Sequence, residues 1–111
     1  MVTIQNYVRA KSLEEAYELN QKKGNCILGG MLWTKMQNRM IQTAIDLCDL
    51  GLNEIEETEE EFLIGAMVSL RQLETDTGLN AYTQGAVRDA VKDIVGVQFR
   101  NLATVGGSIW G

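Results

Sequence analysis

Residues 98–109 read QFRNLATVGGSI and place Gly106-Gly107 directly after a hydroxyl residue, Thr104, and a β-branched residue, Val105. Glycine has no Cβ and tolerates positive φ, so successive backbone N–H groups in such a turn can point into one concavity and hold an anion. A plain tight turn uses the same residues, so the glycine pair alone is a weak indication. The stretch predicts a backbone cradle for a phosphate-rich ligand.

A second stretch of the same character lies nearer the start of the chain. Residues 26–33 read CILGGMLW, an apolar run that breaks at Gly29-Gly30. Two such turns in one small domain suggest two backbone cradles for one phosphate-rich cofactor. A short helix expected over residues 33–40 would aim its N-terminal N–H groups and its dipole at a phosphate there. Lys35 on that helix is interpreted as a solvated surface lysine.

The first half of the chain alternates strands with helices. Strands are predicted at residues 2–8, 25–29 and 43–47 from their β-branched and apolar content. Residues 12–15 (SLEE) form a capping box that begins a helix, and residues 22–24 (KKG) suit its C-terminal end. A strand, a helix and a strand in this order favour a right-handed parallel crossover, so the predicted fold class is α/β.

The second half begins with an acidic run, Glu56–Glu61, which we interpret as a solvated hairpin turn before a returning strand. Consecutive acids without an alternating ligand pattern do not indicate a metal site. Ser69 and Gln72 repeat the capping-box pattern and predict a short helix to about Thr75, which residues 77–80 interrupt. A further helix is expected from residue 84 to the glycine at 96, followed by an unfinished strand over residues 103–105.

Composition excludes several classes of function. A chain of 111 residues is one domain at most, and its net charge of −5 argues against a nucleic-acid partner. No apolar run approaches the roughly 20 residues of a membrane span, and the N-terminus lacks the features of a signal peptide, so we expect a cytoplasmic protein without a membrane partner. The absence of histidine disfavours a self-contained hydrolase. Cys26 and Cys48 are expected to be buried, reduced thiols, and no metal ligand or catalytic residue is assigned.

Four segments together carry a family resemblance: residues 7–16 (YVRAKSLEEA), 28–30 (LGG), 64–67 (IGAM) and 98–107 (QFRNLATVGG). In this order and spacing they resemble the start of the FAD-binding subunit of molybdenum hydroxylases, the xanthine dehydrogenase and carbon monoxide dehydrogenase medium-subunit family. The resemblance implies a two-lobed flavin-binding fold of the PCMH type. A complete N-terminal lobe, with a short mixed or parallel sheet plus helices, would span residues 1–57, and residues 58–111 would start a truncated second lobe.

The resemblance also implies which residues bind FAD. The first turn would cradle the pyrophosphate, and the second would hold phosphate and ribitol oxygens through its N–H groups and the Thr104 hydroxyl. Ile94 matches an apolar position near the flavin ring, whereas Arg100 and Asn101 would fix the shape of the second turn. The implied cofactor-binding residues are Cys26, Ile27, Leu28, Gly29, Gly30, Met31, Leu32, Trp33, Ile94, Thr104, Val105, Gly106, Gly107 and Ser108.

The chain departs from the family at both turns. Met31-Leu32 replaces residues that are often polar in relatives, and Ser108 replaces the customary Asn, so backbone N–H groups are left to bind the cofactor and weaker affinity is expected. The chain stops at Gly111, where the family continues, and we therefore expect a truncated fragment. Such a piece would be inactive and colourless without FAD, and would self-associate through its second half or have a mobile C-terminus.

The implied function is electron transfer. Electrons released at a molybdopterin-binding subunit would pass through a 2Fe-2S subunit to FAD and then to NAD⁺ or another acceptor. Two alternatives stay open: a degenerate flavin subunit that acts as a non-catalytic structural partner, and a flavoenzyme of the same fold such as a cell-wall enolpyruvyl reductase. Flavin absorbance would separate the first alternative from the implied function, and copurifying subunits would separate the second. The oxidised substrate is not implied, because the molybdenum subunit sets it.

Overall fold

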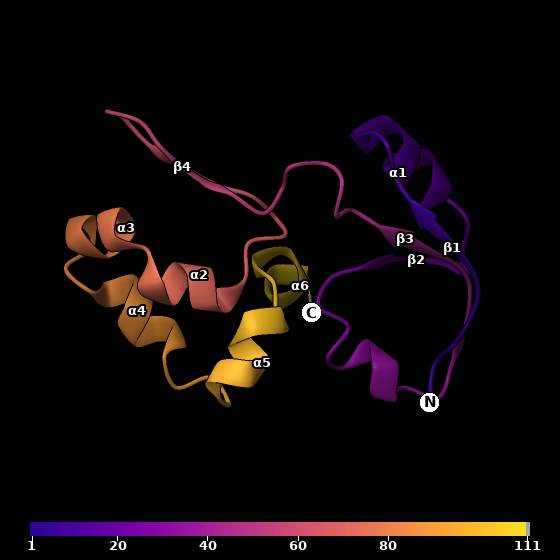
Figure 1. Ribbon diagram of the computed structural model, residues 1–111. Coiled ribbons are helices and arrows are strands. Elements are labelled where there is room, and N and C mark those ends of the chain that lie inside the picture. The colour runs from indigo at the N-terminus through magenta and orange to yellow at the C-terminus, as the bar shows by residue number, and fades with distance from the viewer. Residues whose placement is uncertain (111) are drawn as a thin grey trace. The chain divides into compact units, whose positions relative to one another are not determined.

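The computed structural model describes residues 1–110, which divide into two compact units (Figure 1). One unit is Met1–Leu52, and the other begins at Asn53. Each unit has its own hydrogen-bond network and is described by itself. Within residues 1–110, no helix combines the length and the apolar character that crossing a membrane requires.

The N-terminal unit is built on a three-stranded parallel sheet. Its strands are β1 (Thr3–Arg9), β2 (Asn25–Leu28) and β3 (Met40–Asp46), in the spatial order β1-β3-β2. In the central strand, Ala44 pairs with Tyr7 on one side and with Cys26 on the other. The predicted α/β class with parallel strands is therefore confirmed.

Helix α1 (Leu13–Leu19) begins where the capping residues predicted it. The Ser12 hydroxyl accepts from the Glu15 N–H at 3.0 Å, while the Glu15 carboxylate accepts from the Lys11 N–H at 3.3 Å, one residue before the position that a full capping box requires. The expectation that residues 22–24 (KKG) form the C-terminal end of this helix is wrong. The helix ends at Leu19 with Asn20 as its C-cap, and Gly24 does not have positive φ.

Replacing Ser12 by Ala is expected to lower the free energy of unfolding by about 1 kcal/mol, because one N–H of the first turn of α1 loses its acceptor. Chemical denaturation of the purified protein measures this change. Ser12→Asp keeps an acceptor at the same place and serves as the control that retains stability. Equal midpoints for Ser12→Ala and the wild type would mean that the cap does not stabilise the helix.

Two apolar clusters hold this unit together. Ala10, Ala16 and Ile45 join α1 to the sheet, and Leu19, Leu47 and Leu50 pack around them. A second cluster of Leu28, Ile41 and Ala44 contacts Met31, in the loop that follows β2. The loop that contains the first glycine pair is therefore anchored to the core by its own methionine.

The helix expected over residues 33–40 is wrong. Only the 3-10 turn η1 (Thr34–Met36) forms, and Gln37 is already extended. The Arg39 carbonyl accepts from the Thr3 N–H at 2.9 Å, and Met40 pairs with Thr3, so the segment is drawn into the sheet. For the same reason β3 begins at Met40, earlier than the predicted strand over residues 43–47.

The unit that begins at Asn53 opens with a two-stranded antiparallel hairpin, β4 (Ile55–Glu57) and β5 (Phe62–Ile64). The Thr58 hydroxyl accepts from the N–H groups of Glu60 and Glu61 and closes the turn, so the prediction of an acidic hairpin turn is confirmed. The lobe boundary placed after residue 57 falls at the end of β4. Within the part of the chain that is described, no group of three or more His, Cys, Asp or Glu side chains could hold a metal ion.

Five short helices follow: α2 (Leu70–Thr75), α3 (Thr77–Tyr82), α4 (Ala86–Val91), α5 (Val97–Leu102) and α6 (Val105–Trp110). The Ser69–Gln72 capping box is confirmed in both directions. The interruption predicted over residues 77–80 is wrong, because these residues begin α3. Asp76 alone separates α2 from α3, and its carboxylate accepts from the Leu79 N–H at 2.8 Å. The helix expected from residue 84 to 96 ends at Val91, and residues 98–101 lie within α5.

The strand expected over residues 103–105 is also wrong. Thr104 makes a single antiparallel bridge to Ser69, and helix α6 follows directly. The expectation of two buried thiols fails as well. Both cysteines are free, but Cys26 is half-buried and Cys48 is exposed in the turn after β3.

Candidate functional site

The first glycine pair lies at the carboxyl end of β2. Leu28 is the last strand residue and is buried, residues 29–32 are half-buried, and the Trp33 side chain is 65% exposed. In open parallel sheets, ligands bind outside the carboxyl ends of the strands. The sequence-predicted residues Cys26 to Trp33 therefore form one continuous strand-and-turn segment at the edge where binding is expected.

Backbone N–H groups set the chemistry of this turn. The N–H groups of Gly29, Gly30, Met31 and Leu32 make no backbone hydrogen bond within residues 1–110, whereas the Met31 carbonyl accepts from the Lys35 N–H at 3.0 Å. Met31 has φ 61°, in the left-handed region. Consecutive free N–H groups around a left-handed residue form concavities that bind anions. This turn fits a phosphate group.

The second glycine pair has different geometry, because its N–H groups are engaged within its own unit. The Val105 N–H donates to Val68 O and the Gly106 N–H to Ala66 O, both at 2.8 Å. Thr104 accepts hydrogen bonds from the next two N–H groups, from that of Gly107 at its hydroxyl and from that of Ser108 at its carbonyl. An anion at this turn would compete with these acceptors for the N–H groups of residues 105–108.

Close packing explains the glycine at position 106. A Cβ added there would lie 2.9 Å from the Ala66 carbonyl oxygen, and one at Gly107 would lie 3.0 Å from Thr104 Oγ1. Neither glycine has positive φ, and the pair lies in the first turn of α6. Gly106 permits close approach of the Ala66 backbone and Gly107 that of the Thr104 hydroxyl, which a sequence pattern does not distinguish from close approach of a ligand.

Ile94 lies in the connection between α4 and α5. Its side chain is 37% exposed, its N–H donates to Val91 O, and its carbonyl accepts from Arg100 Nη1 at 3.0 Å. Arg100 is buried and also pairs with Glu74, which agrees with a role in holding the shape of this region. The next residue, Val95, has φ 54°, which is strained for a β-branched side chain.

Replacing Val95 by Gly is expected to raise the free energy of unfolding by about 1 kcal/mol, because glycine adopts positive φ without strain and the Val95 side chain is 75% exposed. Val97→Gly, at the start of α5, is the matched control and is expected to destabilise by a similar amount. Thermal denaturation of both variants measures the difference. A Val95→Gly protein less stable than the wild type would contradict the assignment of strain.

A polar cluster that the sequence analysis did not single out lies at the carboxyl ends of β1 and β3. The Tyr7 hydroxyl donates to Asp46, and Arg9 forms an ion pair with Asp49 at 2.6 Å. The hydrogen bond to Asp46 raises the pKa of Tyr7 to about 12. Burial acts to raise the pKa of Asp46, but bonds from Tyr7 and the Cys48 N–H outweigh it and leave that pKa below its ordinary value. The sequence signal that could have revealed this cluster is the presence of polar residues at the ends of two neighbouring parallel strands.

Burial and the neighbouring Asp46 raise the pKa of the Cys48 thiol. A raised pKa keeps the thiol protonated at neutral pH, and the thiolate is the reactive form. The exposed cysteine is therefore less reactive at neutral pH than a cysteine with an ordinary pKa.

Comparisons with known proteins found a matching family model and similar solved structures. A family model described as "FAD binding domain in molybdopterin dehydrogenase" matches residues 2–111. Quinoline 2-oxidoreductase from Pseudomonas putida 86 has a similar structure, with a TM-score of 0.80 at 22% identity over 94% of this chain and 38% of that one. None of the curated protein sequences compared with the chain matches it.

Two carbon monoxide dehydrogenase structures are also similar. The enzyme from Hydrogenophaga pseudoflava has a TM-score of 0.77 and 27% identity over 94% of this chain and 38% of that one. The reconstituted enzyme from Oligotropha carboxidovorans has a TM-score of 0.78 and 26% identity over 95% of this chain and 38% of that one. The chain thus spans well under half the length of the solved chains that it matches.

Proposed function

The chain belongs to the family of FAD-binding domains in molybdopterin dehydrogenases, and from that membership we propose that it is the N-terminal part of the flavin subunit of a molybdenum hydroxylase. The complete protein would pass electrons from molybdenum and iron–sulfur subunits through FAD to NAD⁺ or another acceptor. The observation that carries the proposal is the run of free N–H groups at residues 29–32. Such a run is suited to a pyrophosphate, which needs several donors within a short span of backbone.

The two glycine turns differ in how many free N–H groups they offer to FAD. The first turn would hold the pyrophosphate through the N–H groups of Gly29, Gly30, Met31 and Leu32. Its shape would be set by the flanking residues Cys26, Ile27, Leu28 and Trp33. The second turn would contribute the Thr104 hydroxyl. Its N–H groups, at Val105, Gly106, Gly107 and Ser108, would reach FAD only after giving up their bonds within the chain. Ile94 would supply apolar contact. FAD, when bound, would supply the redox chemistry, which the side chains of this unit do not provide.

The partners follow from the relatives. Carbon monoxide dehydrogenase is described as a copper- and molybdenum-containing enzyme, and one structure of it is similar to this chain at 25% identity. We therefore propose a molybdopterin-binding subunit and a 2Fe-2S subunit as partners, in a cytoplasmic complex. A xanthine dehydrogenase-like activity and NAD⁺ as acceptor belong to the same proposal. The family match favours this assignment over an enolpyruvyl reductase.

The test is purification of the full-length protein from cells that also make its partner subunits. We expect stoichiometric FAD, measured by absorbance and by release on denaturation, together with copurifying molybdenum and iron. A complex that contains FAD without molybdenum or iron would contradict the hydroxylase assignment. A colourless protein that still binds both partner subunits would support a different function for the same fold.

That different function is a structural subunit without cofactor. One observation favours it, because the second turn leaves no N–H group free for a ligand between Val105 and Ser108. The apolar Met31-Leu32 pair in the first turn adds no side-chain donor. The flavin content of the purified complex therefore separates the two functions.

A further inference from the structure

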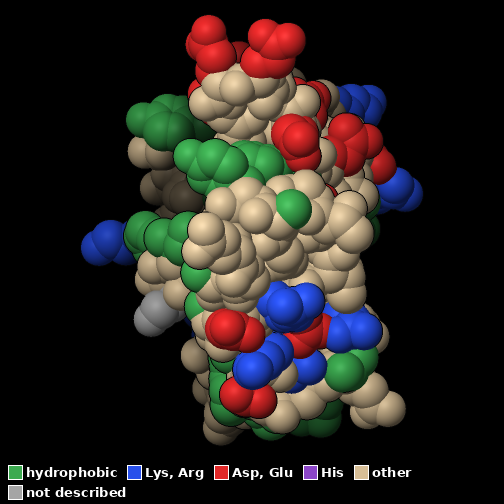
Figure 2. Space-filling model, turned by 90° about the vertical axis from the view of Figure 1, so that its left-hand side faces the viewer, with side chains coloured by type: hydrophobic (Ala, Val, Ile, Leu, Met, Phe, Trp, Pro, Cys, Tyr) green, Lys and Arg blue, Asp and Glu red, His purple; other side chains and the backbone are tan. Residues whose placement is uncertain are grey.

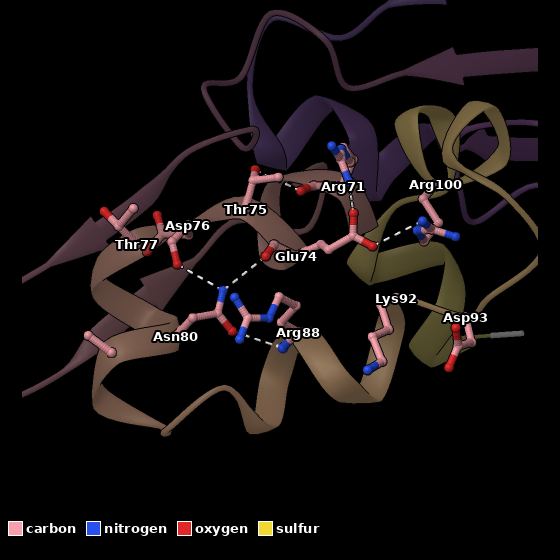
Figure 3. Close-up of a pocket in the computed structure, with 11 residues that line it drawn as sticks. Arg71, Glu74, Thr75, Asp76, Thr77, Asn80, Arg88, Lys92, Asp93 and Arg100 are labelled. Atoms are coloured by element: carbon pink, nitrogen blue, oxygen red, sulfur yellow. Dashed lines mark hydrogen bonds and ion pairs between the residues drawn. The ribbon is translucent and has the colours of Figure 1, made fainter.

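The helical unit carries an open cleft of about 750 Å³ on the face formed by α2, α3, α4 and α5. Four cationic side chains line it: Arg71 from α2, Arg88 from α4, Lys92 at the end of α4, and Arg100 from α5. Figure 2 shows blue basic side chains gathered in the lower part of this face with red acidic ones among them, and Figure 3 shows the residues that line the cleft. No part of this cleft belongs to the two glycine turns.

The deepest charges in the cleft are already paired. Glu74 is buried and forms ion pairs with Arg71 and with Arg100, the latter at 3.0 Å. Arg100 also donates to the Ile94 carbonyl, and its Nε is buried without a partner. Two guanidinium groups therefore share one carboxylate, which leaves the floor of the cleft with an excess positive charge.

The cations toward the solvent are largely unpaired. Within the described chain, the Arg88 guanidinium makes no hydrogen bond or ion pair, although its backbone N–H donates to Asn80 Oδ1 at 2.8 Å and fixes the start of its side chain (Figure 3). Among the described residues, Lys92 forms an ion pair only with Asp89, at 3.4 Å, and both side chains are at least half exposed. An exposed pair of this kind contributes little and is easily exchanged for a better acceptor.

The side chains that line the cleft carry four positive and three negative charges, and Asp89, the partner of Lys92, lies beside them. Glu74 is shared by two arginines, and the Asp76 carboxylate already accepts from the Leu79 N–H as the cap of α3. Within residues 1–110, the Asp93 carboxylate accepts no hydrogen bond and forms no ion pair, although it lines the same cleft as Arg88 and Lys92. The Arg88 guanidinium is therefore the cation of the lining that pairs with no acid within residues 1–110, and it is the group available to an anion.

From this arrangement we infer that the cleft binds a phosphate dianion carried on a small molecule. Arg88 would contact two phosphate oxygens with its planar guanidinium, and Lys92 would add a point charge. Arg71, with 40% of its side chain exposed, would contribute from the opposite helix. The cleft exceeds the size of a bare phosphate and falls within the range of small-molecule sites, so it has room for the organic part of a phosphomonoester.

The test is calorimetric titration of the purified protein with inorganic phosphate and, in a second arm, with phenyl phosphate. We expect both to bind and phenyl phosphate to bind more tightly, because its ring fills space that phosphate leaves empty. The double variant Arg88→Ala/Lys92→Ala is expected to weaken both affinities by about tenfold or more, from loss of charge-assisted hydrogen bonds. Lys22→Ala/Lys23→Ala removes the same charge at exposed positions of the other unit and is expected to bind as the wild type does.

Equal weakening in the two double variants would overturn the site, since it would show only an effect of net charge. Absence of phosphate and phenyl phosphate binding to the wild type would overturn it as well. Amide chemical shifts of the wild type supply a measurement that needs no variant. Phosphate should shift the amides of residues 71–76 and 88–92, and shifts confined to residues 29–32 would assign phosphate binding to the glycine turn instead of the cleft.

Discussion

Replacing Glu74 by Ala is expected to lower the free energy of unfolding by about 3–5 kcal/mol, enough to unfold a domain of marginal stability. Glu74 and Arg100 are both more than nine-tenths buried, and the carboxylate is also paired with Arg71. Removal of the carboxylate leaves a buried guanidinium without its counter-charge, and its Nε already lacks a partner. Helix α2, which contacts both α4 and α5, would lose the ionic link to α5.

Denaturant titration measures this effect, and an exposed ion pair of the same unit provides the control. Asp89→Ala removes the partner of Lys92, whose pair is separated by 3.4 Å and largely exposed, so a change below about 1 kcal/mol is expected. Glu74→Gln, which keeps one acceptor, should fall between the two. If Glu74→Ala destabilised no more than Asp89→Ala, the buried pair would not be the link between α2 and α5.

Replacing Gly30 by Val is expected to remove bound FAD from the full-length protein, with a loss of affinity of about a hundredfold or more. The β-branched side chain would stand among the free N–H groups of residues 29–32 and keep the pyrophosphate from reaching them. Gly30 is not at positive φ, and its N–H has no acceptor to lose, so the fold should survive. Flavin fluorescence titration measures the affinity, and circular dichroism reports the fold.

The matched control is Ala86→Val, which adds the same branched group at the exposed first residue of α4, outside both glycine turns. It should bind FAD as the wild type does. Gly106→Ala should behave differently from both, because its Cβ would meet the Ala66 carbonyl and destabilise the fold before any ligand is involved. Full FAD binding by folded Gly30→Val protein would show that the first turn is not the pyrophosphate cradle.

Local patterns predicted the elements whose stabilising contacts lie close in sequence. Ser12 and Ser69 begin helices α1 and α2 as expected, because an N-cap depends on residues within one turn. The parallel strands followed from β-branched content and from the helix between them. The acidic hairpin turn at residues 58–61 depends on a single local hydroxyl, Thr58, and was predicted for the same reason.

The elements that were mispredicted depend on partners far along the chain. Residues 37–40 leave the expected helix because Thr3 offers them a strand to pair with. Residues 105–110 form α6 rather than a strand because the carbonyls of Ala66 and Val68 take its first N–H groups. The cleft of the helical unit was missed for the same reason, since its four cations come from three helices and have no common spacing in sequence.

The central claim is that residues 29–32 bind the pyrophosphate of FAD, and amide chemical shifts test it most directly. FAD added to isotopically labelled full-length protein should produce its largest shifts at the N–H groups of Gly29, Gly30, Met31 and Leu32. ADP, which carries the pyrophosphate without the flavin, should move the same four amides and leave Ile94 unchanged. Saturable FAD binding that leaves these four amides in place, or no binding at all, would contradict the claim.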